Sequence, residues 1–328
     1  MKRFFTVFFS LMLAVSLFSA CSKSETPESG ESVRPESKKL SIVCSIFPQY
    51  DFCKEIVGEN AELTLLLKSK VDMHNYKPSA EDILKIRNSD IFIDIGGESD
   101  EWANEVFETV KSETPLVLSL INVVDAKDEK ALEGMETEEH DHDDESHEGE
   151  EHAEKDEHVW TSLKNAELIV KAITEKVCAL DPENADEYEK NSKTYLSKLS
   201  SLEKEYAETV KTAKRKVLLF GDRFPFGYLA DDYSLECYAA FSGCSAETRA
   251  SFETIAFLAG KVKEKELPFV LKIDGSDGSV AKTVASQSNA EVRTLNSCQS
   301  VSEDDIKNGV SYLSIMKDNL SVLKEVLN

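Results

Sequence analysis

Histidine is scarce in this chain and is concentrated in one place. Five of the six histidines lie between residues 140 and 158, in the stretch EEHDHDDESHEGEEHAEKDEHVW, and the sixth is His74 in DMHNYKPSAED. Carboxylates surround these histidines in the sequence. Imidazole nitrogen and carboxylate oxygen are ligands that zinc and manganese take in proteins. The first chemistry to consider is therefore the binding of a divalent cation.

The acidic segment 134–157 is expected to be a loop with weak metal sites. It holds nine Glu, four Asp and one Lys, a net charge of −12 out of −24 for the whole chain, and it has no apolar periodicity. We expect such a segment to attract divalent cations, exchange them quickly, and collect or sense zinc. A merely solvated acidic loop is the alternative. The segment contains four histidines, His140, His142, His147 and His152, and His158 follows directly after it.

The N-terminus has the pattern of an exported, lipid-anchored protein. Residues 1–20 carry a basic start followed by an apolar run and small residues, as in a signal peptide, and Cys21 follows directly. We expect cleavage before Cys21, lipid on its thiol, and a flexible tether over 21–38. The alternative is plain secretion, with Cys21 incidental. Nucleic acid is not expected as a partner, because the acidic chain offers no basic face for phosphates.

Short apolar runs alternate with helical patterns along the rest of the chain, which predicts an α/β fold with two lobes. Each lobe is expected to hold a four-stranded parallel sheet covered by helices. One long helical pattern over 183–216 has no internal Pro or Gly and is expected to link the lobes. The predicted strands are 39–47, 61–68, 90–97, 115–121, 216–221, 235–241, 268–274 and 290–295, and helices are predicted at 49–58, 79–89, 100–112, 162–180 and 303–327.

These elements divide the body of the chain into three parts. The N-terminal metal-binding lobe covers 39–161 and includes the acidic segment, a helical part with the long linker covers 162–213, and the C-terminal lobe covers 214–328. In open parallel sheets, ligands bind beyond the carboxyl ends of the strands. The candidate ligands at those positions are His74, His158, Asp222, Glu247 and Asp274, a set without sulfur that suits zinc or manganese.

Two histidine motifs resemble those of the zinc- and manganese-binding receptors of bacterial ABC importers. They are VDMHNYKPSAEDI around His74 and DEHVWTSLKNA around His158, and the likeness continues through IFPQYDF, FGYLADDY and AETRASF. The resemblance implies two rigid lobes, a linker helix with little hinge freedom, and one metal ion at the interface. It also implies a lipid-anchored, monomeric receptor in the periplasm or cell envelope, which delivers the metal to a membrane permease. Tyr76 and Trp160 are expected to pack beside the ligands.

The sequence departs from that family pattern at the third ligand, where many members have histidine. In GDRFPFGYLA, Arg223 aligns without a gap, but arginine has no acceptor for a cation, so Asp222 is chosen and Glu247 is kept in reserve. Asp222 is equally consistent with an ordinary helix N-cap. For the fourth ligand, Asp274 fits best and Asp277 is the alternative.

Six cysteines besides Cys21 are present, and their state is open. Without a C-x-x-C motif a thiolate zinc site is not expected. Three disulfides and scattered core thiols both fit the sequence. The residues are Cys44, Cys53, Cys178, Cys237, Cys244 and Cys298.

The expected function is a binding protein for Zn²⁺ without turnover. Richness in histidine favours zinc over Mn²⁺, because imidazole suits the softer ion. A manganese receptor of the same fold is the alternative within the family. A zinc-dependent hydrolase and a surface adhesin are the alternatives of other classes, although no H-E-x-x-H or G-x-S-x-G motif supports a hydrolase.

Overall fold

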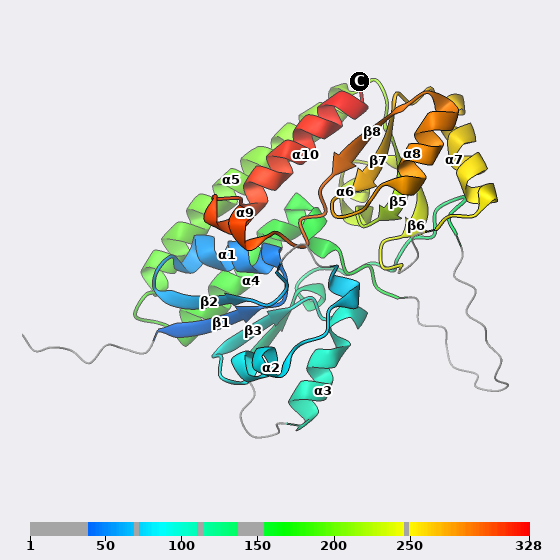
Figure 1. Cartoon of the computed structure of the whole chain (residues 1–328). Helices are drawn as coiled ribbons and strands as arrows, with labels where there is room; N and C mark the ends of the chain where they lie inside the picture. Colours follow the sequence, from blue (N-terminus) through cyan, green and yellow to red (C-terminus); the bar gives the residue numbers. More distant parts are fainter. Residues whose placement is uncertain (1–38, 69–71, 110–114, 137–153, 246–248) are drawn as a thin grey trace, which may run out of the picture. The chain divides into compact units, whose positions relative to one another are not determined.

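The computed structural model describes residues 39–68, 72–109, 115–136, 154–245 and 249–328. Two four-stranded parallel sheets organise this part of the chain (Figure 1), as predicted. The strands of the N-terminal sheet are β1 (Leu40–Cys44), β2 (Ala61–Leu65), β3 (Ile91–Asp94) and β4 (Leu116–Ser119), in the order β2-β1-β3-β4. Those of the C-terminal sheet are β5 (Val217–Phe224), β6 (Glu236–Ser242), β7 (Phe269–Ile273) and β8 (Glu291–Leu295), in the order β6-β5-β7-β8.

Helices connect the strands, as continuous parallel sheets require. In the N-terminal lobe they are α1 (Phe47–Val57), α2 (Ala80–Arg87) and α3 (Glu101–Thr109), with Ser79 capping α2 as its sequence predicts. In the C-terminal lobe they are α6 (Gly227–Asp232), α7 (Phe252–Glu264), α8 (Ser279–Ser288), α9 (Glu303–Lys307) and α10 (Tyr312–Val326). Within the described residues, none of the helices combines the length and the apolar character that crossing a membrane needs.

Two long helices join the lobes. α4 (Leu163–Leu180) packs against α5 (Ala185–Thr212), whose 28 residues extend over about 42 Å. Figure 1 shows α10 lying along α5. Tyr312 at the start of α10 packs its ring edge-on against Phe52 of α1, with 4.8 Å between the ring centroids. One apolar cluster therefore runs from the N-terminal sheet through α4, α5 and α10 to the C-terminal sheet.

Two elements differ from the prediction. The single final helix expected over 303–327 is wrong: the chain breaks after α9 at Gly309, whose φ of +81° lies in the left-handed region that glycine tolerates. The fifth strand was expected to end at residue 221 but runs to Phe224, with a shift of register between Phe220 and Arg223. Asp222 therefore lies inside the strand rather than after it.

Candidate metal centre

His74 is held by two loops at the carboxyl edge of the N-terminal sheet. It lies in η1 (Met73–Asn75), a single 3₁₀ turn after β2, and the carboxylate of Asp72 caps this turn by accepting the His74 backbone N–H at 3.1 Å. Nδ1 of His74 lies 2.8 Å from the hydroxyl oxygen of Ser99. Ser99 belongs to η2 (Glu98–Asp100), which follows β3, so the ring is fixed from two sides.

The hydrogen bonds of Ser99 determine which ring nitrogen of His74 has a free lone pair. The Ser99 hydroxyl donates its only proton to Oε2 of Glu157, so its oxygen accepts from Nδ1–H of His74. Nε2 is then unprotonated, and among the described residues this buried atom has no hydrogen-bond partner. Burial, and then the neighbouring His158, lower the pKa of His74 to about 3 although Asp72 opposes them, so the ring is neutral at pH 7.

His158 has the same arrangement in a more buried setting. Its side chain is 1% exposed, and it precedes η4 (Val159–Thr161). Oδ1 of Asp156 accepts both the backbone N–H and Nδ1–H of His158, each at 3.0 Å. A carboxylate only accepts, so Nδ1 carries the proton and Nε2 has the lone pair. Carboxylates and hydroxyls that orient imidazoles in this way are typical of metal-binding histidines.

The two imidazoles meet a thiol from the other lobe. One ring nitrogen each of His74 and His158 and the sulfur of Cys244 all lie within 4.8 Å of one another, and the ring centroids are 5.4 Å apart. Cys244 follows β6, and its N–H donates to Oε1 of Glu129 at 2.9 Å. Gly243 permits this approach, because a Cβ there would lie 3.1 Å from Cε1 of His158. The predicted donor set held no sulfur, and the structure adds this thiol.

The surroundings of the cluster favour a cation. Glu157 is 2% exposed and packs over Gly97, where a Cβ would collide with its carboxylate. Burial, and then the charges of Glu129, Glu157 and Asp156, raise the pKa of the Cys244 thiol, so it is protonated without a metal. A divalent ion held at this thiol would reverse this preference, because it would replace the proton on sulfur.

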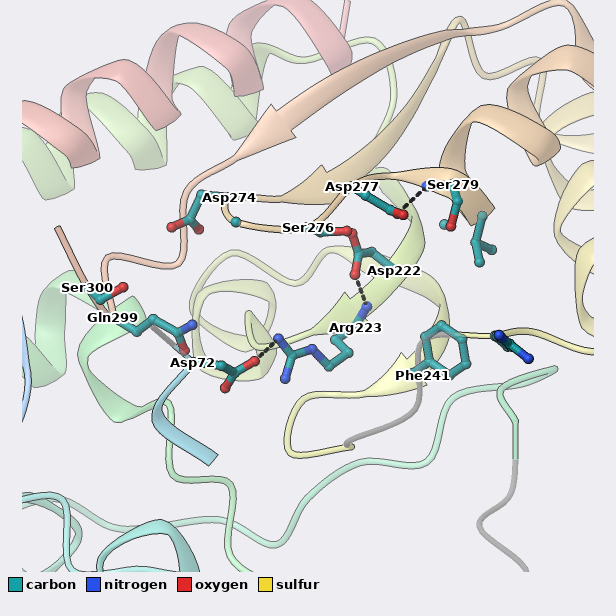
Figure 2. Close-up of a pocket in the computed structure, with 14 residues that line it drawn as sticks. Asp72, Asp222, Arg223, Phe241, Asp274, Ser276, Asp277, Ser279, Gln299 and Ser300 are labelled. Atoms are coloured by element: carbon teal, nitrogen blue, oxygen red, sulfur yellow. Dashed lines mark hydrogen bonds and ion pairs between the residues drawn. The ribbon is translucent and has the colours of Figure 1, made fainter. Parts of the chain in front are cut away.

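Asp222 and Asp274 lie around a different site. Together with Asp72 and Arg223 they line a cavity of about 500 Å³ that neither histidine lines (Figure 2). Asp222 accepts the N–H of Arg223 at 2.9 Å and that of Ile273 at 3.3 Å, so it is bound to β5 and β7 and is not a helix N-cap. Oδ1 of Asp274 accepts the N–H of Ser297 at 2.6 Å. The assignment of these two carboxylates as ligands stays a prediction.

Arg223 takes a structural role at this cavity. Figure 2 shows its guanidinium directed at Asp72, with which it forms an ion pair, while another of its nitrogens donates to the carbonyl of Ser245 at 3.3 Å. The residue that aligns with the missing third histidine thus connects the cap of the His74 turn to the loop that carries Cys244. Asp277, the alternative fourth ligand, is exposed and accepts the N–H of Ser279 at 2.8 Å.

Several predicted positions lie outside the described residues. They are Cys21, His140, His142, His147, His152 and Glu247. Both ends of the acidic segment 134–157 are described and make contacts: the Glu136 N–H donates to the carbonyl of Ala240 at 2.9 Å, and the Asp156 N–H to that of Lys127 at 2.9 Å.

The aromatic neighbours and the cysteines complete the comparison with the prediction. Trp160 is buried, its ring lies 5.5 Å from that of His158, and Tyr76 lines a pocket that His74 also lines. Within the part of the chain that the structure describes, all six cysteines are free thiols, which favours the expectation of scattered thiols over three disulfides. Cys44 and Cys53 approach most closely, with 3.9 Å between their sulfurs.

Comparisons with known proteins agree on one family. Residues 42–326 match the family model described as "Zinc-uptake complex component A periplasmic". The high-affinity zinc uptake system protein ZnuA of Bacillus subtilis is 33% identical over 311 residues, which cover 95% of this chain and 94% of that protein. The zinc-binding lipoprotein AdcA of Streptococcus pneumoniae is 32% identical over 287 residues, but this chain spans only 56% of its length.

A solved structure confirms the likeness in three dimensions. The Zn(II)-bound ZnuA-like domain of Streptococcus pneumoniae AdcA superposes with a TM-score of 0.69 at 29% identity, covering 88% of this chain and 99% of the domain.

Proposed function

Because the chain belongs to the family of the periplasmic zinc-uptake complex component A, we propose that it is an exported receptor that binds zinc with high affinity. In this role it delivers Zn²⁺ to the permease of an ABC importer and performs no turnover. The receptor is a monomer held at the membrane through lipid on Cys21. The family match over 42–326 and the zinc-binding relatives support the proposal.

The observation that carries the proposal is the buried Nε2 of His74. A buried nitrogen acceptor without a partner costs free energy, on the order of 1–3 kcal/mol, unless a ligand satisfies it. Here it lies close to a second imidazole whose Nδ1 is also occupied by an acceptor. Two neighbouring imidazoles whose Nδ1–H groups are both bound by acceptors can each offer Nε2 to the same metal ion. His74 and His158 are accordingly proposed as ligands.

The remaining ligands from the sequence stay proposed with lower support from geometry. Asp222 and Asp274 can serve only if the cation reaches the cavity that they line, and Glu247 lies outside the described residues. Manganese is the weaker candidate as cargo, since it prefers oxygen ligands and the cluster offers nitrogen and sulfur. The loop histidines are proposed to collect or sense zinc near the tight site.

The first prediction tests the receptor itself. Purified without chelator and desalted, the protein is expected to retain one tight zinc ion per chain, measured by elemental analysis and by competition with a chromophoric chelator. Changing both His74→Ala and His158→Ala is expected to abolish this tight binding. Because both rings are substantially buried, circular dichroism must first show that the variant folds.

A matched control uses two histidines of the acidic segment. His140→Ala with His142→Ala removes two imidazoles from the acidic segment and is expected to leave the tight ion in place. Tight zinc that survives the loss of His74 and His158 contradicts the site assignment. A wild-type protein that binds no zinc tightly contradicts the proposed function.

A further inference from the structure

Among the described residues, Cys244 offers a third possible ligand atom beside the two imidazoles. Its sulfur is within 4.8 Å of a nitrogen of each ring, whereas ligand atoms around tetrahedral zinc lie about 3.5 Å apart. Rotation of the Cys244 side chain about χ1 moves the sulfur and can shorten this distance. Zinc accepts thiolate sulfur and imidazole nitrogen in the same site.

Two hydrogen bonds and a glycine hold the loop that carries Cys244 close to the histidines. Glu129 accepts the N–H of Cys244, Arg223 donates to the carbonyl of Ser245, and Gly243 leaves no side chain between the loop and His158. The thiol is half-buried, so it is neither a core cysteine nor a surface one. Cys244 thus places a side chain of the C-terminal lobe close to the His74 ring, whose buried Nε2 has no hydrogen-bond partner among the described residues.

We propose that Cys244 is the third zinc ligand, so that the centre is a two-imidazole, one-thiolate site shared between the lobes. This inference rests on the proposed zinc-binding function and specifies its site. As the zinc–sulfur bond forms, the S–H bond breaks and its proton leaves to solvent, so Zn²⁺ and the thiolate together carry a net charge of +1. A thiolate as third ligand, in place of the carboxylate of Asp222, also makes the centre selective for zinc over manganese.

Cobalt substitution gives a direct test in the wild-type protein. Loaded with Co²⁺ in place of zinc, the protein is expected to show an intense near-ultraviolet band from charge transfer between sulfur and cobalt. Cys244→Ser is expected to lose the band. Cys237→Ser removes a half-buried thiol on β6 and serves as the matched control, which must keep it. Cobalt-loaded wild type without the band overturns the proposal, whether or not the variants fold.

Affinity provides the second measurement. Cys244→Ser is expected to weaken zinc binding by about 100-fold or more in competition with a chelator and to change manganese binding much less. Asp222→Asn is expected to change zinc binding by less than this. If Cys244→Ser binds zinc as tightly as wild type while loss of both histidines abolishes binding, the thiolate assignment fails and the receptor stands. If wild type itself binds no zinc, the proposed function fails first.

Discussion

At the scale of single residues, the site is defined by the groups that occupy the Nδ1 atoms. Asp156 holds Nδ1 of His158, and the pair Ser99–Glu157 holds Nδ1 of His74, so in each ring Nε2 is the nitrogen that faces away from the orienting group. An imidazole without such an acceptor divides its time between two tautomers and several orientations. In the proposed zinc site, these orienting groups are therefore expected to contribute to affinity through the imidazoles that they hold.

The corresponding prediction concerns Asp156. Asp156→Asn weakens the acceptor for Nδ1–H of His158 and is expected to lower zinc affinity by about 10- to 100-fold, measured by chelator competition. Asp128→Asn is the matched control, because exposed Asp128 pairs with exposed Lys155, the residue directly before Asp156. An affinity equal to that of wild type in the Asp156 variant contradicts the orienting role.

The sequence singled out the two histidines that the structure brings together, but it did not point to the thiol beside them. His74 and His158 lie in local motifs, and local motifs are visible in a sequence. Cys244 has no partner cysteine at a metal-binding spacing, and its place at the site depends on Glu129 and Gly243. Glu129 lies in a stretch without any pattern, more than a hundred residues away from Cys244. Such a contact is decided by tertiary packing and has no signal in one sequence.

At the scale of elements, the predictions succeeded where apolar periodicity was long and failed at its interruptions. All eight strands and the linker α5 were predicted, because apolar residues recur along each of them in a short run or at helical spacing. The break at Gly309 was missed, because the residues on both sides fit a single helical pattern. The extension of β5 to Phe224 was missed because its irregular register brings polar residues into the strand. Asp222 was consequently placed after the strand.

One buried carboxylate shows how the elements are joined. Asp51 of α1 is 3% exposed, and its Oδ2 accepts the N–H of Tyr312 at the first position of α10, at 2.8 Å. Burial raises the pKa of Asp51 to about 6, although the hydrogen bond from Tyr312 opposes the rise. The folded state thus holds a proton there more tightly than the unfolded chain does.

The sign of this linkage leads to a prediction. The raised pKa of Asp51 contributes to the free energy of unfolding. This contribution is present in full below about pH 4 and is lost as pH rises through about 6. Asp51→Asn keeps an acceptor for Tyr312 but cannot ionise. The difference in free energy of unfolding between the variant and wild type is expected to shift in favour of the variant by up to about 3 kcal/mol as pH rises from 4 to 8.

Urea titrations at several pH values measure this difference. Glu59→Gln, just after the same helix, is the control, because Glu59 is exposed and its charge is not one of the main causes of the raised pKa of Asp51. A difference between the Asp51 variant and wild type that does not change with pH contradicts the shifted pKa.

At the scale of the whole molecule, half of the net negative charge lies in the acidic segment. Residues 134–157 carry −12 of the net −24, together with four histidines that lie outside the described residues. Attraction by so many charges acts over about 10 Å at 0.1 M salt and weakens as salt rises. Coordination in the buried cluster depends instead on a few short bonds. The two kinds of binding should therefore respond differently to ionic strength.

The last prediction separates them by salt and by mutation. In equilibrium dialysis at low ionic strength, wild type is expected to bind more than one zinc ion per chain, and raising the salt to 0.5 M is expected to leave one. Replacing His140, His142, His147 and His152 by Asn is expected to remove most of the extra ions and leave the tight ion unchanged. Four Glu→Gln changes in the same segment control for charge alone and should reduce the extra ions less, because imidazole binds zinc more strongly than carboxylate. Loss of the tight ion in the histidine variant would show that the segment belongs to the centre itself.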